Sequence, residues 1–134
     1  MMRTLASFFY THKRRTLLLA GLWTVVILTA CFIPGDEVPD IGIFQVDKLA
    51  HIILFGGCAF LWGMFLVAGR EHRRLLLLAA GVVSVVLGIL VELVQSTSWV
   101  RGRGGDIWDA VADAVGAVAG VLLVNYAVRL LEKK

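Results

Sequence analysis

Four long apolar blocks divide this chain of 134 residues, and short charged segments separate them. The blocks run from Thr16 to Pro34, from Leu49 to Gly69, from Leu75 to Gln95 and from Ile107 to Leu131. Each is long enough for a helix to cross about 30 Å of hydrocarbon. Backbone amides find no water inside a bilayer, so spanning segments are helices or strands of a closed barrel. Continuous apolar runs lack the alternation of barrel strands. The pattern therefore predicts an all-α, polytopic membrane protein with four transmembrane helices.

Composition agrees with this fold class. Hydrophobic residues make up 59% of the chain and charged residues 17%, and the mean hydropathy is +0.85. Soluble domains have about 45–50% apolar and about 25% charged residues. We divide the chain into a basic N-terminal segment, residues 1–15, and a single four-helix membrane domain, residues 16–134.

Two details of the apolar blocks concern cysteine. Cys31 and Cys58 lie in or beside apolar blocks, so we expect small packing residues and no disulfide between them. Leu28-Thr29-Ala30-Cys31 resembles a bacterial lipoprotein cleavage box. Such short patterns arise by chance in apolar helices, and we expect the segment before Cys31 to be retained.

Positive charge is concentrated on one side of the predicted helices. The side with both termini and the segment after Gly69 holds every Lys and Arg except Lys48, Arg101 and Arg103. By the positive-inside rule, both termini lie in the cytoplasm, and we expect a multi-pass protein of the bacterial cytoplasmic membrane. The net charge of +3 falls in short runs between apolar blocks, without the interleaved aromatics of single-strand binders, so no nucleic acid partner is expected.

Acidic residues sort in the opposite direction. Only Glu71 and Glu132 lie on the cytoplasmic side. The acids on the outer side are Asp36, Glu37, Asp40, Asp47, Glu92, Asp106, Asp109 and Asp113. The positive-inside rule says little about acids, so this asymmetry indicates a polar feature at the outer leaflet.

Three motifs make up most of this feature, and their spacings of three and four place each motif on one face of a helix. They are Asp47-Lys48-x-x-His51, Glu92-x-x-Gln95 and Arg103-x-x-Asp106-x-x-Asp109-x-x-x-Asp113. Gly116 and Gly120 continue the last stripe inward as a GxxxG motif, which allows close helix approach. The carboxylate stripe is therefore predicted to be packed against another helix of this chain or against a second copy in a homo-oligomer.

Ionisable groups inside a membrane need partners, because a charge at its centre costs at least about 2.5–3.5 kcal/mol. Glu92, Asp109 and Asp113 should therefore face the bundle interior. We expect their partners to come from Lys48, His51, Gln95 and Arg103. Two interpretations follow: a polar pocket open to the outside, or an ion-pair network that only holds the helix ends together.

An outer pocket of this composition allows several kinds of chemistry. His51 beside Asp47 can act as a general base, and Glu92 with Asp109 can form an acid/base pair. Alternatively, His51, Glu92, Asp106 and Asp109 can hold a divalent cation that bridges a phosphate, as an enzyme acting on a phosphorylated lipid requires. Lys48 and Arg103 are cationic groups suited to anionic head groups.

Taken in register, the three motifs and the GxxxG pair resemble the VanZ-like family of bacterial membrane proteins, over about residues 46–120. The resemblance implies that Lys48, His51, Glu92, Gln95, Arg103 and Asp109 are site residues. It also implies a link to resistance against teicoplanin, a lipid-bearing glycopeptide antibiotic that acts on the outer face. One departure is that the family pattern usually has Asn where this chain has Asp113.

The sequence and the resemblance together predict an outward pocket that binds or modifies an amphiphile of the cell envelope. The candidates are a phospholipid, a lipid-linked wall precursor and a lipidated glycopeptide, in addition to the surrounding membrane lipids. The alternative is a non-catalytic scaffold or assembly subunit. A proton-coupled transporter is disfavoured because the cytoplasmic halves of the predicted helices lack polar residues.

Overall fold

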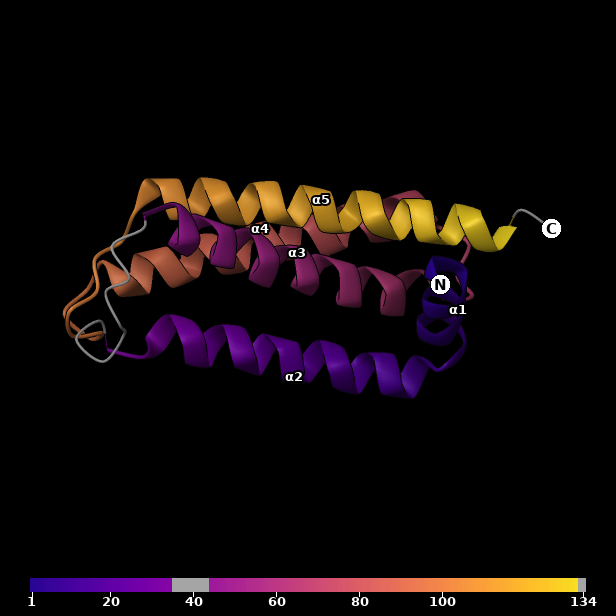
Figure 1. The fold of residues 1–134 in the computed structure, drawn as a ribbon, viewed down its shortest axis with the longest axis horizontal. Helices are drawn as coiled ribbons and strands as arrows, with labels where there is room; N and C mark the ends of the chain where they lie inside the picture. Colours follow the sequence, from indigo (N-terminus) through magenta and orange to yellow (C-terminus); the bar gives the residue numbers. More distant parts are fainter. Residues whose placement is uncertain (35–43, 133–134) are drawn as a thin grey trace.

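A computed structural model describes residues 1–34 and 44–132 of the chain (Figure 1). Within these ranges the protein is all-helical. Its five helices are α1 (Met2–Thr11), α2 (Lys13–Phe32), α3 (Phe44–Val67), α4 (Arg73–Gln95) and α5 (Ile107–Glu132). The four long helices, α2 to α5, are each long and apolar enough to cross a membrane, which confirms the predicted multi-pass membrane protein. Asp36, Glu37 and Asp40 lie outside the described residues.

The helix ends have local causes. α2 ends at Phe32 because Pro34 disfavours helical backbone at the residue before it, and Ile33 is extended with φ −60° and ψ 130°. α3 ends shortly before Gly69, whose φ of +67° suits a residue without a Cβ atom. α2 begins at Lys13, so the basic run that we assigned to a separate N-terminal segment forms its first turn.

The four long helices run side by side, and both termini lie at the same end of the bundle (Figure 1). α3 and α5 make the most extensive contact, α4 packs against both, and α2 packs mainly on α3. α1 lies at the terminal end, turned across the long helices, and contacts α5, α2 and α3. The turn between α4 and α5 lies at the opposite end.

Glycines allow α3 and α5 to pack backbone against backbone. A Cβ atom on Gly116 would collide with the carbonyl oxygen of Ile52, and one on Gly120 would collide with that of Gly56. A Cβ atom on Gly56 would lie 3.0 Å from the Gly116 carbonyl oxygen. The predicted GxxxG stripe therefore packs against α3 of the same chain.

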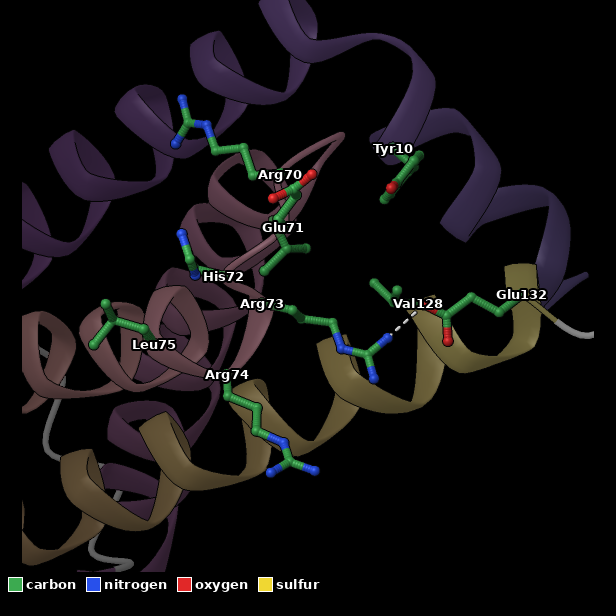
Figure 2. A pocket seen from close by; sticks show the side chains of 10 residues that line it. Tyr10, Arg70, Glu71, His72, Arg73, Arg74, Leu75, Val128 and Glu132 are labelled. Carbon is green, nitrogen blue, oxygen red and sulfur yellow. Dashed lines mark hydrogen bonds and ion pairs between the residues drawn. The ribbon is translucent and has the colours of Figure 1, made fainter.

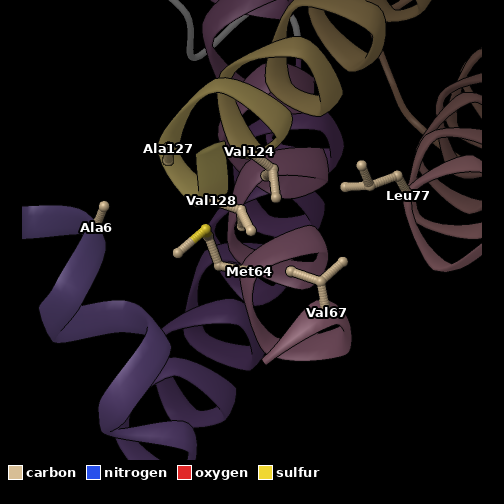
Figure 3. Packing of buried hydrophobic residues seen from close by; sticks show 7 residues of the cluster. All are labelled: Ala6, Met64, Val67, Leu77, Val124, Ala127 and Val128. Atoms are coloured by element: carbon tan, nitrogen blue, oxygen red, sulfur yellow. The ribbon is translucent and has the colours of Figure 1, made fainter. Parts of the chain in front are cut away.

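Many large apolar side chains point away from the bundle, whereas alanine is the commonest of the buried hydrophobic residues in the described ranges. Leu18 is 72% exposed and Leu122 is 61% exposed, as expected for helices that face lipid rather than water. Near the termini, one buried cluster joins α1 to α3, α4 and α5; its members are Ala6, Met64, Val67, Leu77, Val124, Ala127 and Val128 (Figure 3).

A second buried cluster lies nearer the other end and contains both cysteines. It consists of Ile27, Cys31, Phe55, Cys58 and Val91. Both cysteines are free thiols, as the sequence predicted. Polar side chains also attach α2 to α3: the indole of Trp23 donates to the Leu54 carbonyl at 2.8 Å, and that of Trp62 donates to the Thr24 hydroxyl at 3.1 Å.

Candidate functional site

Ionisable side chains gather where α3 begins, α4 ends and α5 begins. This is the end of the bundle opposite the termini (Figure 1). We call this group the acidic end; it comprises Asp47, Lys48, His51, Glu92, Asp106, Asp109 and Asp113. Five carboxylates thus face one ammonium group and one imidazole. Each of the three predicted motifs contributes to the group, but Gln95 and Arg103 do not belong to it.

Lys48 joins the first turn of α3 to the start of α5. Its Nζ donates to Asp106 Oδ2 at 2.6 Å and also to Asp109 Oδ1, and it lies 3.8 Å from Asp47 Oδ2. The Lys48 side chain is 15% exposed. This single cation therefore pairs with several carboxylates at once, as the sequence led us to expect for Asp109.

Asp106 both pairs with Lys48 and begins α5. Its Oδ1 accepts a hydrogen bond from the Trp108 backbone N–H at 2.8 Å, as the side chain of an N-cap residue does. The hydrogen bond from Lys48, followed by that from the Trp108 N–H, lowers the pKa of the Asp106 carboxyl below its ordinary value. Asp106 is therefore a carboxylate at neutral pH and has its charge near the positive end of the α5 dipole.

His51 lies one turn further into the bundle and pairs with Asp113 of α5. Its Nδ1 is 2.8 Å from Asp113 Oδ1, and its Nε2 is 3.9 Å from Asp109 Oδ2. The sequence interpretation made Asp47 the partner that orients His51; the structure gives Asp113 this role, because the close α3–α5 contact brings it against the ring. A buried imidazole held by a carboxylate is the arrangement of an oriented general base.

Glu92 is the polar contribution of α4. Its Oε2 accepts a hydrogen bond from the backbone N–H of Asp106 at 2.8 Å. We expected its partner among Lys48, His51, Gln95 and Arg103; its hydrogen bond instead goes to the backbone that leads into α5. No hydrogen bond joins Glu92 to Asp109 in the described part of the chain.

Arg103 and Gln95 bind α2 and not the carboxylates, which makes the predicted pairing of these two residues wrong. Arg103 donates to the carbonyl oxygens of Ile33 at 3.2 Å and Ala30 at 3.3 Å. Gln95 Nε2 donates to the Cys31 carbonyl oxygen at 2.6 Å. The last carbonyl groups of a helix receive no hydrogen bond from a backbone N–H of the same helix. The end of α2 lies beside both side chains, which supply the missing donors. These two predicted site residues therefore cap α2.

Two overlapping groups of side chains at the acidic end have the spacing of metal ligands. Asp47, His51 and Asp109 form the outer group, and His51, Glu92 and Asp113 form the inner group. In each group one ligand atom per residue lies within 4.8 Å of the others. The sequence proposed His51, Glu92, Asp106 and Asp109 as one ligand set; in the structure these residues divide between the two groups, and Asp106 belongs to neither.

Gly88 is a site residue that our sequence interpretation did not identify. A Cβ atom at this position would lie 2.6 Å from Asp113 Oδ2 and 2.8 Å from Asp113 Cβ, so glycine provides the space that the carboxyl group fills. Gly88 precedes Glu92 by four residues and therefore shares its helix face. That spacing is the sequence signal that points to it.

A cavity of about 530 Å³ lies at the other end of the bundle, between the α3–α4 turn, α1 and the end of α5. Its polar lining consists of Tyr10, Arg70, Glu71, His72, Arg73, Arg74 and Glu132. Figure 2 shows Arg73 reaching to Glu132, with Nη1 2.6 Å from Oε1. We call this region the basic end; the sequence had assigned its arginines only to membrane topology.

Comparisons with known proteins add no relative to this geometry: no family model, no curated protein sequence and no solved structure matches the chain.

Proposed function

We propose that this chain is a VanZ-like protein of the bacterial cytoplasmic membrane whose acidic end binds the polar head of a cell-envelope amphiphile at the outer leaflet. The observation that carries the proposal is the convergence of ionisable side chains from α3, α4 and α5 at one end of a membrane bundle. Ionisable residues at membrane depth are retained for ligands, ions or protons in many membrane proteins.

The charge balance of the acidic end restricts the head group. With five carboxylates against one lysine and one histidine, a bare anion is repelled more than it is attracted. A suitable head group carries an amine, or a phosphate accompanied by a divalent cation. A phospholipid, a lipid-linked wall precursor and a lipidated glycopeptide remain the candidate ligands.

The test is equilibrium binding to the purified full chain in lipid nanodiscs. The probes are teicoplanin and fluorescent phosphatidylethanolamine, each with the wild type and with His51→Gln. Loss of the imidazole is expected to raise Kd at least about tenfold. Arg74→Gln at the basic end is the matched control and should leave Kd unchanged. Equal affinity of folded His51→Gln and wild type for both probes contradicts the proposal.

A cellular test addresses the resistance that the resemblance implies. Expression of the chain in a teicoplanin-susceptible bacterium should raise the inhibitory concentration of teicoplanin, and expression of His51→Gln at equal level should not. An unchanged inhibitory concentration with the wild type removes the link to resistance but leaves the binding experiment to decide about other amphiphiles.

A non-catalytic scaffold is the second candidate, and one observation favours it. Arg103 and Gln95 use their donors on α2, so part of the predicted site holds helices together. In this case Glu92→Gln and Asp109→Asn should lose thermal stability in detergent together with any phenotype. A variant that is as stable as the wild type but inactive counts against the scaffold.

A further inference from the structure

The inner part of the acidic end contains two buried carboxylate oxygens without a hydrogen-bond partner. They are Oε1 of Glu92 and Oδ2 of Asp113. The Glu92 residue is 7% exposed and Asp113 is 1% exposed. A buried carboxylate oxygen without a partner is costly, and two of them in one buried group indicate that a positively charged group belongs there.

The geometry around these carboxylates suits a single ion. His51, Glu92 and Asp113 come from α3, α4 and α5, and one ligand atom of each lies within 4.8 Å of the others. Ligand atoms that share an ion at about 2.0–2.2 Å are about 3–4 Å apart. Nδ1 of His51 and Oδ1 of Asp113, 2.8 Å apart, are already close to that separation.

The inner group is a better cation site than the outer group. In the outer group, Lys48 bonds to Asp109 and lies 3.8 Å from Asp47, so an ion there would meet a fixed positive charge. The hydrogen bonds given above for the inner group come from His51 and from the Asp106 backbone N–H. Because both groups need the same imidazole, an ion in one of them excludes an ion in the other.

We propose that His51, Glu92 and Asp113 form a binding site for one divalent transition-metal ion of the Zn²⁺ or Mn²⁺ type. The ion takes the place of the proton between His51 Nδ1 and Asp113 Oδ1, and that proton is released to solvent. Two carboxylates and one neutral imidazole then balance the charge of the ion, which is the favoured state in a medium of low dielectric constant. His51 Nε2, which faces Asp109, is left to orient the ring.

The ligand chemistry selects the class of metal. An imidazole nitrogen with two carboxylates suits Zn²⁺ and Mn²⁺, whereas Mg²⁺ and Ca²⁺ prefer oxygen ligands alone. Asp113 supplies a second carboxylate beside Glu92 and so adds the charge that the ion requires.

The first experiment measures metal binding by the purified full chain in detergent after treatment with EDTA. Calorimetric titration with Zn²⁺ should show saturable binding of one ion per chain, and Mg²⁺ at equal concentration should not compete. A saturating concentration of Zn²⁺ should also raise the melting temperature of the wild type, because an ion that binds the folded protein more tightly than the unfolded chain stabilises it. Absence of both saturable binding and a melting shift overturns the proposal, and this result requires no variant.

Three variants locate the ion. Asp113→Asn and Glu92→Gln keep the shape of each side chain but remove a ligating charge, and each should weaken Zn²⁺ binding at least about tenfold. Asp47→Asn is the matched control, because it removes a carboxylate of the outer group only, and it should bind Zn²⁺ like the wild type. Loss of binding in Asp47→Asn with retention in Asp113→Asn overturns the inner site.

The metal site stands independently of the proposed amphiphile binding, and parallel measurements separate the two. Amphiphile affinity is measured on the EDTA-treated and on the Zn²⁺-loaded protein. Zn²⁺ binding without amphiphile binding supports the metal site and counts against the proposed function. Amphiphile binding without Zn²⁺ binding supports the proposed function and counts against the metal site.

Discussion

The two ends of the bundle carry opposite charge, and they hold that charge in different ways. At the acidic end, Lys48, His51 and Asp113 are largely buried and bonded across α3 and α5. At the basic end, arginines surround an open cavity, and the Arg73–Glu132 pair has side chains 28% and 59% exposed. The predicted topology needs only the number of positive charges on one side, whereas the acidic end depends on specific pairs.

Because the ion pairs of the two ends differ in burial, we expect them to contribute differently to the free energy of unfolding. Breaking a buried ion pair leaves a desolvated charge without its partner, which costs about 3–5 kcal/mol. An exposed pair contributes about 0–1 kcal/mol, because water and salt replace the partner. The acidic end should therefore hold the bundle together, and the basic end should orient it.

The largest effect is expected for Lys48→Met. The substitution leaves Asp106 and Asp109 without their shared cation, and the free energy of unfolding should fall by about 3 kcal/mol. Reversible unfolding in mixed detergent measures it. Arg73→Met removes a cation from the basic end in the same way and should cost less than about 1 kcal/mol. Equal losses of unfolding free energy in the two variants would contradict the proposed difference between the acidic end and the basic end.

The next effect concerns the α3–α5 contact that brings the pairs together. Gly116→Ala places a methyl group against the Ile52 carbonyl, and such overpacking should cost about 1–3 kcal/mol. Gly21→Ala in α2 is the matched control, because nothing lies within 4 Å of the added carbon. Helix propensity alone then predicts a gain of up to about 1 kcal/mol. A loss in both variants would contradict the role of the α3–α5 contact.

A smaller effect is expected for Arg103→Ala. Its two hydrogen bonds to carbonyls of α2 are partly exposed, and their loss should cost about 1–2 kcal/mol. Amphiphile affinity should stay at the wild-type value, because Arg103 caps a helix. An unchanged melting temperature with loss of amphiphile binding would instead place Arg103 in contact with the ligand.

The number and class of the helices could be predicted because the bilayer imposes them. A spanning segment needs about 20 apolar residues and must satisfy its own backbone, so hydropathy alone located α2 to α5. The start of α2 at Lys13 was missed because a first turn can extend into charged residues. The helical character of residues 2–11 was also missed, because α1 is too short and too polar to resemble a span.

Membership of the acidic end could be predicted, and Asp109 and Asp113 have partners from the expected set, Lys48 and His51. The carboxylate that orients His51 could not be predicted. Spacing places His51 and Asp47 on one face of α3, and it says nothing about which helix covers that face. The glycine contact between α3 and α5 puts Asp113 against the ring instead. Arg103 was assigned to a carboxylate for the same reason, because the sequence does not reveal that α2 ends beside it.

The smallest effect on stability is expected for a substitution at the basic end. Glu132→Gln breaks the ion pair with Arg73. Because both side chains of this pair are accessible to water, the free energy of unfolding should change by less than about 0.5 kcal/mol. Any effect should disappear at 1 M salt, where the Debye length is about 3 Å. Asp109→Asn, which weakens the bond to buried Lys48, should keep most of its larger effect in the same salt. If salt reduced the loss of unfolding free energy equally in Glu132→Gln and Asp109→Asn, burial would not distinguish the ion pairs of the two ends.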